Sequence, residues 1–272
     1  MGSHDDVVLD WCIANVDAEI SSELLWQLGA VAIEEQSRGA DVVLVAGFES
    51  RAQLMTALRE CEGSTLRDVD IDWRDAWKTH VVSYTIADAI TVVPAWCPEP
   101  MGAASRIMVI DPGESFGLAH ATTQLCIEIL CEVVETGNQV LDIGCGSGVL
   151  SIAAVQLGAG AVTAIDINPQ AIIDTNRNSV RNGVESRVAA SVDGIRDLFE
   201  TFDVVVANLG GAQVLISMAD DLRRVTKPRG RIVLGGLLDS NVEAGLSAYS
   251  WASEVARVRR DGWNVIVLQP PL

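Results

Sequence analysis

A short apolar stretch with alternating glycines at its centre constrains the fold of this chain more than any other feature. It reads VLDIGCGSGVLSIAA, from Val140 to Ala154. Its apolar start, its glycines and its apolar second half predict a buried strand, a tight turn and a helix. Because glycine has no Cβ, Gly144, Gly146 and Gly148 let the backbone turn sharply and approach a ligand closely. The stretch therefore predicts a ligand site between a strand and a helix.

The acid before these glycines indicates which ligand the turn can accept. Dinucleotide folds use G-x-G-x-x-G and hold a pyrophosphate at the helix N-terminus. Here the order is D-x-G-x-G-x-G, with Asp142 at the end of the strand. A carboxylate at that place disfavours a pyrophosphate and favours a sulfonium or an α-ammonium group.

Polar residues follow three later strands of the same region. Asp166, in AIDINPQAI, is placed to accept the two hydroxyls of a ribose, although it could instead cap the helix before Pro169. Asp193, in SVDGI, could accept from an adenine amino group or simply belong to a turn. Asn208, in FDVVVANLGG, could hold an amine or end the strand as a cap. Together with the glycine turn, these residues favour S-adenosylmethionine as the cofactor.

The second half of the chain alternates between helix and strand patterns. This alternation predicts an α/β fold with a doubly wound, Rossmann-like parallel sheet. Asp261-Gly262 is a hairpin signal, so the sheet should end in an antiparallel pair. The expected elements are helices at 122–134, 148–157, 169–182, 194–199 and 212–225, and strands at 139–143, 161–165, 187–191, 203–207 and 230–235.

The first part of the chain predicts a smaller α+β domain. Its pattern is strand 7–13, a helix capped by Ser21 or Ser22, strands 31–35 and 41–46, a helix from Ser50 to about Cys61, and strand 65–71. This βαββαβ order is that of a ferredoxin-like domain. We therefore expect such a domain at 1–70, a linker with a small hairpin at 71–104, and the nucleotide-like domain at 105–272.

Composition limits the class of partner. The net charge is −18, and residues 1–70 carry fourteen acids against four bases, so a phosphate backbone such as DNA is disfavoured and a basic protein is favoured. No apolar run reaches the ~18 residues of a membrane span. The six cysteines form no C-x-x-C pair and no histidine stands at ligand spacing, so no metal is expected. We expect a cytoplasmic monomer.

Several segments of the chain resemble those of a known family. DPGESFGLAHATT (111–123), the glycine stretch, AIDINPQAI, RNSVRNGV and FDVVVANL are similar to segments of the PrmA family, methyltransferases of the stalk-base protein L11 of the large ribosomal subunit. That family joins a ferredoxin-like substrate-recognition domain to a methyltransferase domain through a linker with a D-W-x-x-x-W stretch, here Asp72, Trp73 and Trp77. The resemblance runs nearly end to end.

The resemblance implies a cofactor, a reaction and site residues. S-adenosylmethionine would contact Thr123, Gly144, Asp166 and Asn208, with Asn208 near the transferred methyl. The reaction would be methylation of lysine side chains, the α-amine, or both, on a basic ribosomal protein. His120 is the second candidate for a catalytic role, by orienting the loop or the amine, although a lone histidine is often structural. Two other interpretations stay open: a small-molecule N- or O-methyltransferase, and a cofactor-binding relative without turnover.

Two departures from the family pattern bear on the substrate. The family loop reads F-G-T-G-T-H-P-T-T, whereas here Phe116 to Thr123 is one residue shorter and lacks the middle Thr-Gly. The fourth-strand motif N-I-L is Asn208-Leu209-Gly210. The stretch 111–123 is expected to cover the methyl-transfer cleft, so both departures fall where amine and cofactor would meet.

Overall fold

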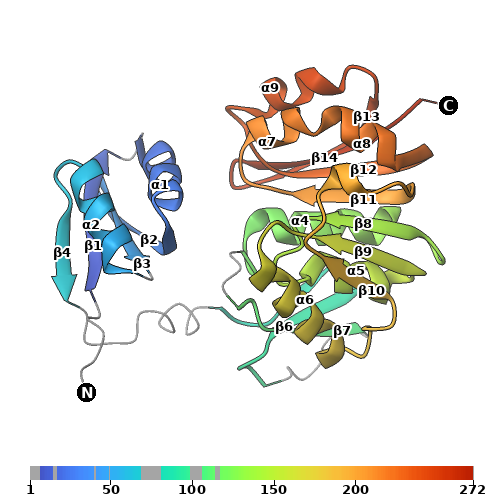
Figure 1. The fold of residues 1–272 in the computed structure, drawn as a ribbon, viewed down its shortest axis with the longest axis horizontal. Helices are drawn as coiled ribbons and strands as arrows, with labels where there is room; N and C mark the ends of the chain where they lie inside the picture. Colours follow the sequence, from blue (N-terminus) through green and yellow to red (C-terminus); the bar gives the residue numbers. More distant parts are fainter. Residues whose placement is uncertain are drawn as a thin grey trace. The chain divides into compact units, whose positions relative to one another are not determined.

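The computed structural model divides the chain into two compact units, residues 1–81 and 82–272 (Figure 1). The structure describes residues 7–14, 17–39, 41–48, 50–68, 81–98, 106–113 and 117–271. Each unit has its own sheet and its own core. The expected hairpin of the 71–104 segment lies in the second unit.

The first unit has the strand order β2-β3-β1-β4, in which every neighbouring pair is antiparallel. This is the order of a split βαβ plan, so the ferredoxin-like expectation is confirmed. Leu9, Leu25, Leu44 and Leu54 are among its buried core residues. The elements are β1 (Val7–Ala14), α1 (Ala18–Gln27), β2 (Ala30–Arg38), β3 (Asp41–Phe48), α2 (Arg51–Glu60) and β4 (Thr65–Asp68).

The two helices of this unit begin differently. Ser50 caps α2 as expected: its Oγ accepts from the backbone N–H of Gln53, and the Gln53 side chain accepts from the N–H of Ser50. The expected cap of α1 at Ser21 or Ser22 is wrong, because α1 already begins at Ala18 after Asp17. Ser21 is buried, on the same helix face as Ala18 and Leu25. The buried stripe therefore starts one turn earlier than the serines indicate.

The second unit is built on the sheet β10-β9-β8-β11-β12-β14-β13. The strands from β10 to β12 run parallel, and β14 and β13 are antiparallel, so the doubly wound fold with an antiparallel end is confirmed. Asp261 and Gly262 turn the last hairpin with φ of +53° and +80°. The strands are β8 (Gln139–Ile143), β9 (Ala161–Ile165), β10 (Val188–Ser191), β11 (Phe202–Asn208), β12 (Thr226–Leu238), β13 (Ser253–Arg260) and β14 (Trp263–Gln269).

The helices of this unit form two groups. Contacts join α4 to α5 and α5 to α6, and a second set joins α7 to α8 and α9. The single helix expected at 212–225 is wrong: it breaks at Met218 into α7, which contacts α9, and α8, which contacts β11 and β12. The helices are α4 (Ala121–Val133), α5 (Val149–Leu157), α6 (Pro169–Arg181), α7 (Ala212–Ser217), α8 (Ala219–Val225), α9 (Val242–Leu246), and the 3₁₀ turns η3 (Ile195–Asp197) and η4 (Ser247–Tyr249).

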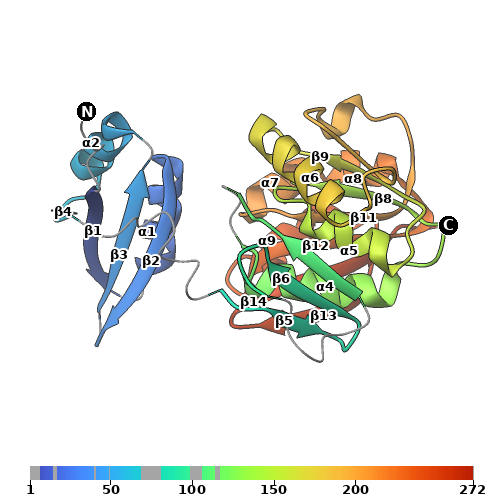
Figure 2. The same ribbon diagram turned by 90° about the horizontal axis from the view of Figure 1, so that it is seen from below.

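A separate three-stranded sheet of the second unit precedes the seven-stranded sheet along the chain. Its order is β5 (Tyr84–Ile86), β6 (Ile90–Pro94) and β7 (Arg106–Ile110), with an antiparallel hairpin followed by a parallel pair. The sheet packs on α4 through β5 (Figure 2) and on α5 and α6 through β7 (Figure 1). The hairpin is thus part of the second unit and reaches the helices that carry the candidate site.

Within the part of the chain that the structure describes, every helix is too short or too polar to cross a membrane.

Candidate functional site

The glycine turn after β8 is shaped by three left-handed glycines. Gly144, Gly146 and Gly148 have φ of +72°, +53° and +78°, which strain any residue with a Cβ. The N–H groups of Gly144 and Cys145 donate to the carbonyl of Ile165 at 2.8 and 3.1 Å, so the turn is tied to the end of β9. A Cβ on Gly144 would lie 2.2 Å from Leu209 Cδ2. The turn therefore meets the residues after β11 at van der Waals distance.

Asp142 is buried beneath this turn, with 1% of its surface exposed. Ser151 Oγ donates to its Oδ2 at 2.6 Å, whereas Oδ1 has no hydrogen-bond partner among the described residues. Burial raises the pKa of the Asp142 carboxyl to about 6, the Ser151 hydrogen bonds oppose this shift, and the charge of Asp166 adds to it. A buried acceptor without a partner next to the turn suits a cationic part of a ligand.

Asp166 joins the glycine turn to α6. Its Oδ2 accepts from the N–H of Gly146 at 3.0 Å and its Oδ1 accepts from the N–H of Asn168 at 2.9 Å. The alternative that Asp166 caps α6 is wrong, because Asn168 is the cap and accepts from the N–H of Gln170. Each carboxylate oxygen retains a lone pair, so the half-buried Asp166 can still accept two hydroxyls.

Asn208 ends β11 and contacts the first turn of α4. Its Nδ2 donates to Thr123 Oγ1 at 3.3 Å, and Thr123 is buried. A Cβ on Gly235 would lie 2.6 Å from Asn208 Oδ1, so the neighbouring strand approaches closely as well. Asp193 is exposed after β10, which pairs with β9, the strand that ends at Asp166. The candidate residues therefore lie at the carboxyl ends of adjacent parallel strands, around the switch point between β8 and β11.

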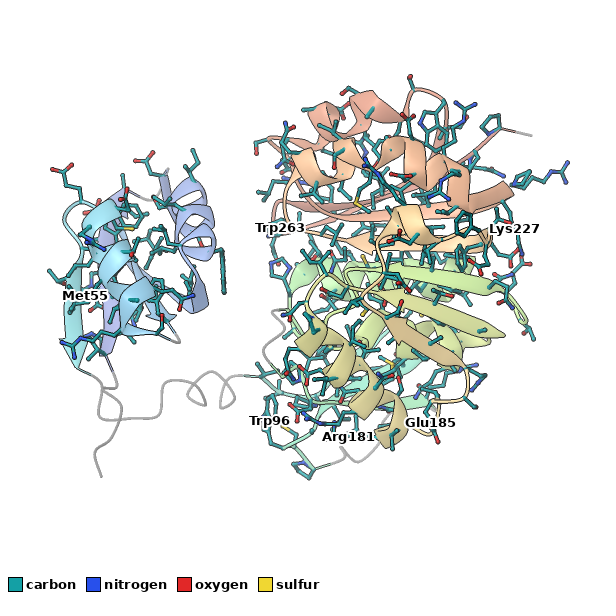
Figure 3. All side chains as sticks on the ribbon, viewed as in Figure 1. Met55, Trp96, Arg181, Glu185, Lys227 and Trp263 are labelled. Atoms are coloured by element: carbon teal, nitrogen blue, oxygen red, sulfur yellow. The ribbon has the colours of Figure 1, made fainter. Side chains whose placement is uncertain are left out.

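His120 is the N-cap of α4. Its Nδ1 accepts from the N–H of Thr122 at 3.3 Å and lies 2.9 Å from Thr122 Oγ1. Its ring packs edge to face on Trp263, labelled in Figure 3, with the centroids 4.9 Å apart. Burial lowers the pKa of His120, so the imidazole is neutral near pH 7. With Nδ1 accepting, the proton of the neutral ring is on Nε2.

Some contacts of the glycine turn and of the 111–123 stretch were not expected from the sequence. Tyr84 OH on β5 donates to the carbonyl of Leu118, within the 111–123 stretch. On α6, Thr175 Oγ1 donates to the carbonyl of Gly146 at 3.0 Å, and Asn178 Nδ2 donates to that of Ser147 at 2.8 Å. The available signal was a set of polar residues on the buried side of an amphipathic helix, in the segment RNSVRNGV and just before it.

Some residues of the expected site fall outside the described ranges. They are Asp72, Trp73 and Trp77 of the linker motif, and Phe116 of the 111–123 stretch.

The described residues fit S-adenosylmethionine. Asp142 Oδ1 offers a buried acceptor for a positive group, and the glycines leave space that a Cβ would fill. Asp166 has acceptor capacity for a ribose, and Thr123 and Asn208 place polar atoms at the end of β11. Such a donor and acceptor set can hold a nucleoside with a cationic tail beside an amine.

Comparison with known proteins agrees with this geometry. The family profile described as ribosomal protein L11 methyltransferase (PrmA) matches residues 10–270. A ribosomal protein L11 methyltransferase of Sorangium cellulosum is 35% identical over 253 residues, which cover 86% of this chain and 80% of that protein. One from Ralstonia nicotianae is 33% identical over 92% of this chain and 94% of its own length.

A solved structure supports the same relationship. The crystal structure of a ribosomal protein L11 methylase from Lactobacillus delbrueckii subsp. bulgaricus superposes with a TM-score of 0.64 and 25% identity. The superposition covers 71% of this chain and 100% of the chain in the crystal structure. The similarity therefore extends from the sequence to the fold.

Proposed function

The chain belongs to the ribosomal protein L11 methyltransferase (PrmA) family, and on that premise we propose that it methylates amines of a basic protein of the large ribosomal subunit. It is a methyltransferase that uses S-adenosylmethionine. The proposed acceptors are lysine side chains, the N-terminal α-amine, or both. The observation that carries the proposal is the hydrogen bond between Thr123 and Asn208, which joins the last residue of the 111–123 stretch to the strand end beside the glycine turn.

The bound cofactor supplies a methyl group made electrophilic by its sulfonium. The chain's own residues then have to bind the cofactor, align the amine with its methyl group and exclude water from both. Asp166 would bind the ribose, Asp142 a positive group of the amino-acid part, and Asp193 the adenine edge. We assign to Asn208 the alignment of the incoming amine with the methyl carbon. His120 contributes by capping α4, which fixes Thr123 three residues further on. A protein nucleophile is not required, because displacement at the methyl carbon is direct.

The acceptor must arrive as a neutral amine. A lysine that enters a desolvated cleft loses its proton more readily than one in water, because burial disfavours the charged form. Neutral His120 adds no positive charge that would repel a lysine. General-base catalysis by a side chain is therefore optional in this proposal.

The rest of the chain fits a protein substrate. The proposed recognition domain is 1–70, with 71–104 as the linker and 105–272 as the methyltransferase domain. The fourteen acids against four bases of 1–70 favour a basic partner through long-range attraction. We place the protein in the cytoplasm, as a monomer.

Transfer of labelled methyl from S-adenosylmethionine to recombinant L11 tests the proposal directly. We expect labelled L11, with mass spectrometry showing the modified amines. Label on a metabolite and none on L11 would instead support a small-molecule methyltransferase. Cofactor binding without any labelled acceptor in a whole lysate would support a relative without turnover.

A further inference from the structure

A polar stripe on α6 faces the end of β7 and the residues after it. Asp174, Asn178 and Asn182 stand four residues apart, so they share one side of the helix. Asn182 Oδ1 accepts from the N–H of Val109 at 2.9 Å, and its Nδ2 donates to the Val109 carbonyl at 2.8 Å. Four helical residues rise about 6 Å, and two extended residues span nearly the same distance. The polar side chains of the stripe are therefore spaced like every second residue of the extended segment that faces them.

Asn178 forms the same kind of hydrogen-bond pair with Asp111, two residues after Val109. Its Oδ1 accepts from the N–H of Asp111 at 3.0 Å, and its Nδ2 donates to the Asp111 carbonyl at 2.7 Å. The same Nδ2 donates to the carbonyl of Ser147, in the glycine turn, at 2.8 Å. Arg181, labelled at the end of α6 in Figure 3, donates to Oδ1. One side chain thus binds the turn after β8 and the segment after β7.

The chemistry of this position suits asparagine in particular. Asn178 is fully buried, and its amide uses both donors and both acceptor lone pairs. An aspartate would lose both donated bonds, and an alanine would leave the two carbonyls without this donor. Replacing Asn178 would leave buried polar groups without a partner, which costs more free energy than a hydrogen bond normally contributes.

We propose that Asn178 is a positioning residue that couples the glycine turn, where the cofactor binds, to the segment Asp111–Gly113, which leads towards His120 and Thr123. The inference rests on the proposed function, because it assumes that the glycine turn holds the cofactor. Binding at the turn fixes the Ser147 carbonyl, and through Asn178 it fixes Asp111. Asn178 touches neither the cofactor nor the amine in this proposal; it acts through the backbone of both segments.

Asn182, the C-cap of α6, provides a matched control. It also forms a pair of hydrogen bonds with a backbone N–H and carbonyl, but its Nδ2 reaches Val109 and its own helix at Asn178, not the glycine turn. Asn182→Ala therefore removes an anchor of similar size without removing the coupling. A general loss of stability would affect both variants, whereas a loss of coupling would affect only Asn178→Ala.

Hydrogen exchange on the full chain, with and without S-adenosylhomocysteine, tests the coupling. We expect this probe to slow exchange in residues 144–149 and also in 107–113 of the wild type. In Asn178→Ala it should slow only 144–149, and in Asn182→Ala it should slow both. With L11 as substrate, kcat of Asn178→Ala should fall on the order of tenfold while KM for the cofactor changes less than about threefold.

Two results would overturn the proposal. One is slowed exchange in 144–149 of the wild type without any change in 107–113, a result that needs no variant. The other is equal loss of the effect in Asn182→Ala and Asn178→Ala. Should Asn178→Ala fail to fold, Asn178→Asp keeps the acceptor for Asp111 and takes its place. If coupling is present but L11 is not methylated, the proposed substrate is wrong and the coupling stands.

Discussion

At the scale of single residues, the buried carboxyl of Asp142 is the least ordinary group of the site. It sits in a core position, keeps one hydrogen bond from Ser151, and has a pKa near 6 because burial disfavours its charge. A core acid of this kind reduces stability when it ionises. Its position beside the glycine turn is consistent with binding a cation, since a positive ligand would offset that reduction.

This raised pKa predicts a definite pH dependence. In the unfolded chain Asp142 ionises near its ordinary value of 3.8, whereas in the folded chain it keeps its proton to about pH 6. Between these values the unfolded state binds fewer protons, so the free energy of unfolding falls as pH rises. Asp142→Asn should remove this fall, and should make the ligand-free protein more stable at pH 7 by roughly 1 to 3 kcal/mol. Urea unfolding of both proteins from pH 4 to 7 measures the difference.

The same substitution should act in the opposite direction on the cofactor. Loss of the negative charge removes an attraction for a positive group, so S-adenosylhomocysteine should bind Asp142→Asn more weakly even though the protein is more stable. Weaker binding together with lower stability would show that Asp142 supports the fold and not the ligand.

Asp166 permits a second test at this scale. Asp166→Ala should weaken S-adenosylhomocysteine binding by about 1 to 3 kcal/mol through the loss of hydrogen bonds to the ribose. Titration calorimetry measures the loss, and Asp220→Ala, an exposed change of the same charge on α8, serves as the control. Because Asp166 also accepts from Gly146 and Asn168, thermal unfolding is recorded alongside. Unchanged affinity would rule out the ribose assignment.

At the scale of elements, the hairpin before the main fold contributes to the site. Tyr84 of β5 holds the carbonyl of Leu118, and burial raises its pKa, so the hydroxyl keeps its proton as a donor. Gln124 of α4 also donates to this stretch, at the carbonyl of Ala119 at 2.8 Å. The stretch between Gly117 and His120 is therefore held from a strand and from a helix.

Tyr84→Phe should loosen this attachment without disturbing the cofactor residues. Removal of the hydroxyl leaves the Leu118 carbonyl without this donor, which should cost about 1 kcal/mol of stability. We expect a lower kcat for methyl transfer and an unchanged affinity for S-adenosylhomocysteine. Thr85→Val is the matched control, because it also deletes a hydroxyl from β5, one that bonds Thr91. Equal effects of the two variants on kcat would argue against a role of the loop attachment.

The elements also show what local sequence can and cannot predict. The strand 139–143, the turn with Gly144 and the hairpin at Asp261-Gly262 were predictable, because periodicity and glycine chemistry act within a few residues. The break at Met218 was not, because it depends on tertiary packing: both helices contact β12, but α7 also contacts α9, whereas α8 contacts β11. Tyr84 and Asn178 were missed for the same reason: their partners lie 34 and 67 residues away along the chain.

At the scale of the whole molecule, the proposed recognition and the proposed chemistry fall in separate units. Every residue proposed above to bind the cofactor, from Thr123 to Asn208, belongs to the unit 82–272, which has its own sheet and core. The unit 1–81 has a separate sheet and holds the acidic stretch of the chain. Binding energy from a remote part of a substrate can support catalysis at the reacting centre. The first unit would supply that energy if it holds the protein substrate.

Deletion of residues 1–81 tests this separation. The fragment 82–272 should bind S-adenosylhomocysteine within about threefold of the full chain, since ~0.7 kcal/mol is the most that the missing unit should contribute there. Its transfer of labelled methyl to L11 should fall on the order of a hundredfold, because the substrate loses its remote contacts. Circular dichroism of the fragment establishes that it is folded, and the full chain at raised salt provides a second comparison, in which screening of the acidic unit should slow transfer. A fragment that methylates L11 as fast as the full chain would place recognition in the second unit.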